Sequence, residues 1–183
     1  MKLNLAIKNR WSPRVFSEKE VTAEMIELLF EAARWAPSAM NEQPWKYFYA
    51  QQTDQEKFNK LVDFLMPGNQ TWAKNARLLI VSVVKKNYDY KNRPNRNALH
   101  DLGAANISVA IQAAEMGLQA HQMAGFDKEG ISEFLKLDID YLEPVTVFAI
   151  GFAGNPESLP EDQKKRELAE RKRNPLNEFV FKI

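Results

Sequence analysis

Two arginines four residues apart, with a serine between them, are the first residues whose types and spacing suggest a chemistry. They lie in the run Arg10-Trp11-Ser12-Pro13-Arg14. On a helix, like charges at this spacing repel each other unless an anion bridges them. Guanidinium groups bind phosphate oxygens through charge-assisted hydrogen bonds, and the Ser12 hydroxyl is a further donor. The pattern predicts a phosphate clamp, with a pair of solvated arginines as the alternative.

A second cluster of polar residues lies in the run APSAMNEQPW, residues 36–45. Ser38, Asn41 and Gln43 offer both hydrogen-bond donors and acceptors, which suits the edge of a planar heterocycle. Pro37, Ser38 and Asn41 are also common turn residues, so a turn without any ligand explains them equally well.

A third cluster, Arg171-Lys172-Arg173, lies near the C-terminus. If the end of the chain folds back to Arg10 and Arg14, these cations add donors to the same phosphate. The alternative is a solvated charged surface, as most charge runs are.

Hydrophobic periodicity indicates the elements that position these clusters. Apolar residues at helical spacing predict helices from Thr22 to just before Pro37, over 55–66, over 101–118 and over 128–135. Short apolar or aromatic runs predict strands over 45–50, 78–84 and 145–150, with a polar loop over 85–96. The helix over 101–118 is apolar on nearly all sides, with Ile107, Ile111, Ala114 and Leu118 on one face. It should therefore be central and buried.

The composition limits the chemistry that the chain can perform. With 183 residues, 45% of them apolar, and a net charge of +1, the chain reads as one globular domain. The absence of cysteine excludes disulfides, thiolate nucleophiles and iron–sulfur clusters. The sequence contains no G-x-G-x-x-G, P-loop, G-x-S-x-G or H-E-x-x-H motif, and its two histidines have no metal-ligand spacing. Redox chemistry, if present, must come from a bound cofactor.

Neither a membrane nor a nucleic acid is an expected partner. The longest aliphatic run, residues 78–84, is too short to span a bilayer, and residues 1–8 lack the apolar run of a signal peptide. We therefore expect a cytoplasmic protein. A net charge of +1 provides no basic field, and acidic residues interrupt the cations near the C-terminus.

In their order and spacing, the three clusters resemble the FMN-dependent nitroreductase family in its short form. The family motif R-x-S-x-R-x-F is matched by Arg10, Ser12, Arg14 and Phe16, and A-P-S-x-x-N-x-Q-P-W by Ala36, Pro37, Ser38, Asn41, Gln43, Pro44 and Trp45. The small-residue helix ending at Met116-Gly117-Leu118, the following Gly125-Phe126-Asp127 and the basic run 171–176 fall where the family has its central helix, flavin loop and closing tail. The resemblance implies an α+β fold with a central mixed or antiparallel sheet flanked by helices. It also implies a single domain over 1–183 and an intertwined homodimer, with 151–183 as a tail that docks on the partner subunit.

The resemblance also implies the residues that would contact FMN. The phosphate and ribityl chain would meet Arg10, Trp11, Ser12 and Arg14, joined by Arg171 and Arg173. Pro37, Ser38, Ala39 and Asn41 of the other subunit would border the isoalloxazine ring. Asn69 would face its pyrimidine edge, with Lys74 or Trp72 as alternatives, and Lys74 near N1 would stabilise the anionic reduced flavin. Gln122, Met123, Ala124 and Gly125 would pass beside the ring and direct a backbone N–H toward its N5.

The function implied is reduction of nitroaromatics, quinones or related electron-poor acceptors by NADH or NADPH, in a ping-pong order. The flavin carries the chemistry, so no catalytic side chain is required. Many relatives have an acidic residue in place of Ala124 and a hydroxyl in place of Ala39, which leaves the substrate side altered. Residues 85–100 are the expected lid, and their lysines and arginines could contact the phosphates of NADPH, but a solvated loop is the safer interpretation. The alternatives are a flavin-holding or regulatory protein without turnover, and a flavin-degrading or dehalogenating branch of the same fold.

Overall fold

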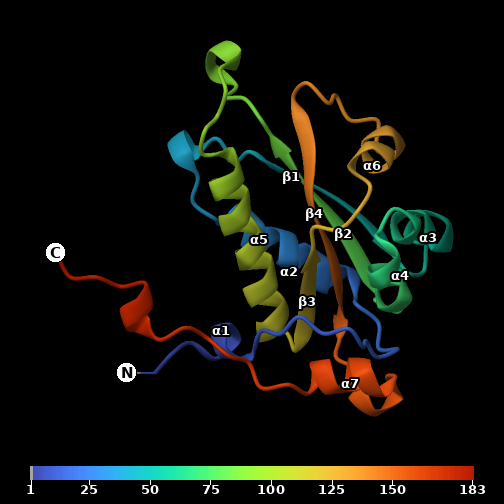
Figure 1. The fold of residues 1–183 in the computed structure, drawn as a ribbon. Helices are drawn as coiled ribbons and strands as arrows, with labels where there is room; N and C mark the ends of the chain where they lie inside the picture. Colours follow the sequence, from blue (N-terminus) through green and yellow to red (C-terminus); the bar gives the residue numbers. More distant parts are fainter. Residues whose placement is uncertain (1) are drawn as a thin grey trace.

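The computed structural model describes residues 2–183. Its centre is a four-stranded sheet in the order β1-β2-β4-β3, in which each neighbouring pair is antiparallel (Figure 1). The strands are β1 (Trp45–Gln51), β2 (Leu78–Lys85), β3 (Leu118–Met123) and β4 (Leu142–Phe152). The predicted α+β class and central antiparallel sheet are confirmed.

Helices cover both faces of this sheet (Figure 1). The helices are α1 (Leu5–Asn9), α2 (Ala23–Arg34), α3 (Gln55–Asp63), α4 (Pro67–Ala73), α5 (Ala98–Glu115), α6 (Lys128–Phe134) and α7 (Glu161–Glu167). α2 and α5 pack on one face against Leu78 and Ile80 of β2, whereas α3, α4 and α6 pack on the other against Leu79 and Val81. Because alternate residues of β2 enter different cores, the strand is apolar along nearly its whole length.

The structure confirms most predicted elements and corrects several boundaries. The predicted helix over 101–118 ends at Glu115; Gly117, with φ of +76°, then turns the chain into β3, so Leu118 belongs to a strand. Pro67 begins α4 instead of closing the helix that starts at Gln55, because proline fits the first turn of a helix. The strand predicted over 145–150 extends over all of β4, and β3 itself was not predicted.

The central helix α5 is buried on one face only, so the expectation of a fully buried helix is wrong for a single chain. Leu102, Val109 and Ala113 lie in the core, at most 1% exposed. On the opposite face, Leu99 and Ile107 are 60% and 43% exposed. These two apolar side chains are exposed to solvent, although α1 also packs against α5.

The two ends of the chain lie side by side below α5 (Figure 1). Arg171 donates hydrogen bonds from its guanidinium to the carbonyl oxygens of Lys8 and Arg10, each at 2.7 Å. The part of the predicted tail from residue 151 to Arg171 thus contacts its own chain. After Arg171, every residue is exposed, including Leu176, Phe179, Val180, Phe181 and Ile183.

No helix within residues 2–183 has the length and apolar character needed to cross a bilayer.

Candidate functional site: an arginine cluster beside strand β3

The segment from Arg10 to Arg14 is an extended turn and not a helix, because α1 ends at Asn9. The like-charge repulsion expected at helical spacing therefore does not arise from this geometry. Two side chains of β3 hold the segment from below. Gln119 Oε1 accepts a hydrogen bond from the Trp11 backbone N–H at 2.6 Å, and His121 Nδ1 lies 2.8 Å from the carbonyl oxygen of Pro13.

A buried carboxylate fixes the same segment from the other side. Glu167, at the end of α7 and 8% exposed, accepts hydrogen bonds from Trp11 Nε1 and from the Arg14 backbone N–H, both at 3.0 Å. Each oxygen thus has one neutral donor, and the guanidinium of Arg14 is not paired with this carboxylate. Glu167 orients the segment and leaves the charge of Arg14 available.

Three of the arginines predicted at this site, Arg10, Arg171 and Arg173, lie close enough together for their charges to interact. Arg10 Nη1 donates to Ser12 Oγ at 3.2 Å, and the Arg171 guanidinium stacks over the Trp11 ring at 5.1 Å. Burial lowers the pKa of Arg10, and the nearby charges of Arg171 and Arg173 lower it further. Among the side chains that the structure describes, no carboxylate forms an ion pair with any of these arginines.

A cluster of cations without acidic partners favours an anion. A phosphate dianion would remove the mutual repulsion that lowers the pKa of Arg10, and Arg10, Ser12 and Arg14 offer donors of the appropriate type. Arg171 contributes differently from the prediction, since its two hydrogen bonds go to backbone carbonyls and hold the segment. The Arg173 guanidinium donates to the carbonyl oxygen of Lys172.

The end of β3 brings a second group of predicted residues together. Asn69 Nδ2 donates to the Gly125 carbonyl oxygen at 3.4 Å, and a Cβ at Gly125 would lie only 3.4 Å from Asn69 Nδ2. Gln122 and Ala124 are exposed, whereas Met123 is 3% exposed and faces the core. Met123 can therefore contact a ligand through its backbone but not through its side chain.

Trp72 and Lys74, the alternatives to Asn69, lie in different environments. Trp72 is 4% exposed and stacks between Phe16 and His121, at ring-centroid distances of 6.4 and 4.4 Å, so it is part of the core. Lys74 is exposed at the end of α4, and its carbonyl oxygen accepts a hydrogen bond from Gln52. Of the three, Asn69 is the residue that contacts segment 122–125.

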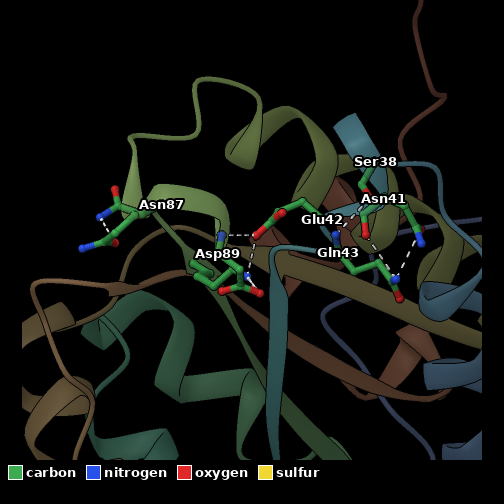
Figure 2. Close-up of polar contacts among 8 residues, drawn as sticks. Ser38, Asn41, Glu42, Gln43, Asn87 and Asp89 are labelled. Atoms are coloured by element: carbon green, nitrogen blue, oxygen red, sulfur yellow. Dashed lines mark hydrogen bonds and ion pairs between the residues drawn. The ribbon is translucent and has the colours of Figure 1, made fainter.

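The predicted ring-bordering residues lie in a strained loop at the other end of α5. Met40, Asn41 and Gln43 have φ angles of 56°, 55° and 48°, a region that costs non-glycine residues about 1–3 kcal/mol each. The loop is held by Asp101, 3% exposed, whose Oδ2 accepts from the Ala39 N–H at 2.9 Å. Ser38 Oγ accepts from the Gln43 N–H at 3.0 Å (Figure 2).

The two groups of residues are separated by the length of α5. An 18-residue helix is about 27 Å long, with the 38–41 loop near its start and the arginine cluster near the point where the chain enters β3 (Figure 1). Pro37, Ser38, Ala39 and Asn41 therefore lie apart from the Arg10–Arg14 segment in one chain. One flavin-sized ligand can contact both groups only if a second chain contributes one of them.

Four supporting residues were not predicted: Asp101, Gln119, His121 and Glu167. The alternation of Leu118 and Ala120 with Gln119 and His121 is a period-two signal that would have indicated a strand with two polar side chains on one face. Glu167 had no such signal, because it lies in a densely charged run that is typical of a solvated surface.

The fold and site define an α+β protein with a cationic segment beside an edge strand, and comparison with known proteins identifies its family. The model of the Nitroreductase family matches residues 7–152. A protein of Archaeoglobus fulgidus, provisionally named NADH dehydrogenase/NAD(P)H nitroreductase, is 26% identical over 169 residues, which cover 92% of this chain and 91% of that protein. The chain belongs to the Nitroreductase family, so the resemblance predicted from its motifs is confirmed.

Solved structures agree with this assignment. A structure described as an oxidoreductase containing FMN is 36% identical, with a TM-score of 0.92, and the match covers 99% of this chain and 91% of that one. A nitroreductase family protein of Clostridium difficile 630 is 25% identical, with a TM-score of 0.75, and the match covers 99% and 98%.

We predict that His121 makes stability depend on pH. Burial lowers its pKa below the usual value of 6.5, so the folded chain favours the neutral ring. This stabilising contribution is fully present above about pH 6.5 and is lost as the pH falls through the lowered pKa, with a slope of at most about 1.4 kcal/mol per pH unit. His121→Asn keeps a donor near Pro13 but cannot titrate.

Urea denaturation between pH 7.5 and 5.5 measures the difference between the wild type and His121→Asn. That difference should change with pH, because the asparagine of the variant has no group that titrates in this range. A pH-independent difference at His121 would show that its ring does not titrate in this range.

Proposed function

We propose that this protein binds FMN and uses NADH or NADPH to reduce nitroaromatics, quinones or related electron-poor small molecules. The observation that carries the proposal is the cluster of Arg10, Arg171 and Arg173, which has no acidic partner among the described side chains, in a chain of the Nitroreductase family. Arg14 lies in the same segment as Arg10. The cluster is suited to the terminal phosphate of a mononucleotide. The adjoining segment 122–125 leaves backbone and small side chains open toward a flat ring.

When bound, FMN supplies the hydride and electron transfer. The residues of the chain supply position and charge. Arg10, Ser12 and Arg14 would bind the phosphate, and the backbone of 122–125, next to Asn69, would border the ring. Lys74, exposed on the helix that carries Asn69, would favour negative charge on the ring.

We further propose a ping-pong order, because one planar cofactor offers the donor and the acceptor the same position in turn. A chain that holds FMN without turnover is the other candidate, and it is favoured by Ala124 and Ala39, which cannot position a water or accept a hydrogen bond from a substrate with their side chains. The cytoplasmic location expected from the sequence remains a prediction.

A homodimer would complete the site. The exposed face of α5 carries Leu99, Gly103, Ile107 and Ile111, four residues apart in each step, and Gly103 has no atom within 4 Å of where a Cβ would be. A second copy of this face, packed in the opposite direction, would bring the 38–41 loop of one chain to the arginine cluster of the other. The exposed apolar residues after Arg171 would then dock on the partner subunit.

The proposed activity predicts a yellow protein that loses its visible absorption after anaerobic addition of NADH or NADPH and regains it with a nitroarene or a quinone. The measurement is a visible absorption spectrum of the purified protein. A yellow protein that does not bleach would favour the flavin-holding alternative. A chain that neither contains FMN nor binds it when FMN is added would contradict the proposal.

Arg14→Gln should weaken FMN binding about 10- to 100-fold, because it removes a charge-assisted hydrogen bond to phosphate. This variant retains the backbone N–H of position 14, which donates a hydrogen bond to Glu167. The measurement is quenching of flavin fluorescence on titration with apoprotein. Arg34→Gln, on α2, is the control and should bind FMN like the wild type. An unchanged dissociation constant for Arg14→Gln would exclude its role in phosphate binding.

Ile107→Glu should convert the homodimer into a monomer, because it places a charge at the centre of the exposed apolar face of α5. Light scattering after size-exclusion chromatography measures the mass. Ile139→Glu, which alters an exposed apolar residue elsewhere, should remain dimeric. A wild-type monomer that binds FMN would refute the shared site.

A further inference from the structure

The segment that follows β2 is a hydrogen-bonded hairpin and not the loose polar loop that the sequence suggested. Asn87 and Pro94 form an antiparallel bridge, and the Tyr88 N–H donates to the Arg93 carbonyl oxygen at 2.8 Å. The side chains of Asn87 and Asn92 are hydrogen-bonded at 2.9 Å. These contacts give residues 86–97, here called the basic hairpin, a defined shape.

An ion-pair network attaches the basic hairpin to the loop that carries Met40 (Figure 2). Lys85 Nζ lies 2.8 Å from Glu42 Oε1 and 2.8 Å from Asp89 Oδ2, and the Asp89 N–H donates to Glu42 Oε1 at 2.6 Å. The side chains of Lys85 and Glu42 are only 19% and 12% exposed. Partly buried pairs of this kind are screened less by salt than surface pairs, so the loop and the hairpin are held together.

A cavity of about 590 Å³ lies where these two segments meet. Its walls are Met40 from the loop and Tyr88, Arg93, Pro94, Arg96 and Asn97 from the basic hairpin. The acidic residues nearby, Glu42 and Asp89, are both paired with Lys85.

The polar groups of this cavity are mainly donors. Arg93 and Arg96 are exposed, and among the described side chains their guanidinium groups form neither an ion pair nor a hydrogen bond. The Tyr88 hydroxyl accepts a hydrogen bond from Asn97 Nδ2 at 3.4 Å, which leaves its own proton free to donate. Asn97 also precedes α5, an 18-residue helix, so the positive end of the helix faces the same region.

We propose that this cavity binds an anionic oxygen group, a carboxylate or a phosphate, on a substrate whose reacting end lies beside Met40. Two guanidinium groups without partners provide the charge, and the Tyr88 ring, Pro94 and Met40 provide apolar walls for the body of the substrate. The inference rests on the proposed function, because the 38–41 loop is the part expected to border the flavin. The anionic group has two sources: an acidic aromatic acceptor, or the phosphates of the pyridine nucleotide.

Binding to the FMN-loaded protein, measured by calorimetry at fixed ionic strength, tests the proposal without turnover. The acceptor probes are 4-nitrobenzoate and its neutral analogue 4-nitrobenzamide, and the nucleotide probes are NADP⁺ and NAD⁺. The double variant Arg93→Gln/Arg96→Gln should weaken the binding of 4-nitrobenzoate or of NADP⁺ by about 10- to 100-fold, depending on which of them the cavity binds. Lys91→Gln, which removes a charge from the same hairpin outside the cavity, is the matched control and should have little effect.

Each outcome decides between the sources or overturns the proposal. Selective loss of 4-nitrobenzoate binding assigns the cavity to an acidic acceptor, and selective loss of NADP⁺ binding assigns it to the 2′-phosphate of the donor. Equal loss for NADP⁺ and NAD⁺ assigns it to their shared diphosphate. Unchanged binding of all four probes, or an equal loss in Lys91→Gln, overturns the proposal.

Failure of the proposed function is recognised separately. If the wild type does not bind FMN, the same titrations on the flavin-free chain still test the cavity. An anion preference that depends on Arg93 and Arg96 would then support the cavity while the flavin enzyme is rejected. A protein that binds FMN and bleaches with NAD(P)H, but shows no such preference, would retain its function and lose the anion site.

Discussion

The length of α5 is the constraint on which the rest of the site depends. Its 18 residues form a helix about 27 Å long, with the 38–41 loop near its start and the arginine cluster near the point where the chain enters β3. Its inner face is fixed by the core that contains Val109 and Ala113. No local rearrangement of loops can close this distance within one chain. The outer face of the same helix exposes apolar side chains. In the proposed homodimer, two copies of α5 packed antiparallel would bury these side chains. The same contact would bring the 38–41 loop of one chain to the arginine cluster of the other.

At both ends of this helix, the nearby acidic side chains pair with groups other than the arginines of the site. Near β3, Glu167 and Gln119 accept hydrogen bonds from neutral N–H groups, so the segment is fixed while Arg10 and Arg14 remain without acidic partners. Next to the basic hairpin, Lys85 at the end of β2 forms ion pairs with Glu42 and Asp89, the two nearby carboxylates. Guanidinium groups without acidic partners repel each other and destabilise the chain slightly, and an anionic ligand of the kind proposed for each end would offset this repulsion.

The sequence predicted those parts of the site that are local in the chain. The turn at 37–43, the α4 residue Asn69 and the tail residue Arg171 lie where short-range patterns and the family motifs placed them. The supports could not be predicted, because Glu167 contacts Trp11 and Arg14 across more than 150 residues. Such a contact depends on how α7 packs, and a charged run gives no periodic signal for that packing.

The fold separates cofactor binding from substrate selection. The arginine cluster and segment 122–125 depend on β3 and α7, whereas the cavity of the basic hairpin depends on Glu42, Lys85 and the turn after β2. Since these supports share no residue, a substitution at Arg93 or Arg96 can change which substrates bind while the contacts around Arg10 and Arg14 remain intact. In the proposed enzyme, the cationic hairpin would therefore be the part of the chain in which substrate preference can vary while the cofactor contacts are kept, since a fold alone does not determine which substrate binds.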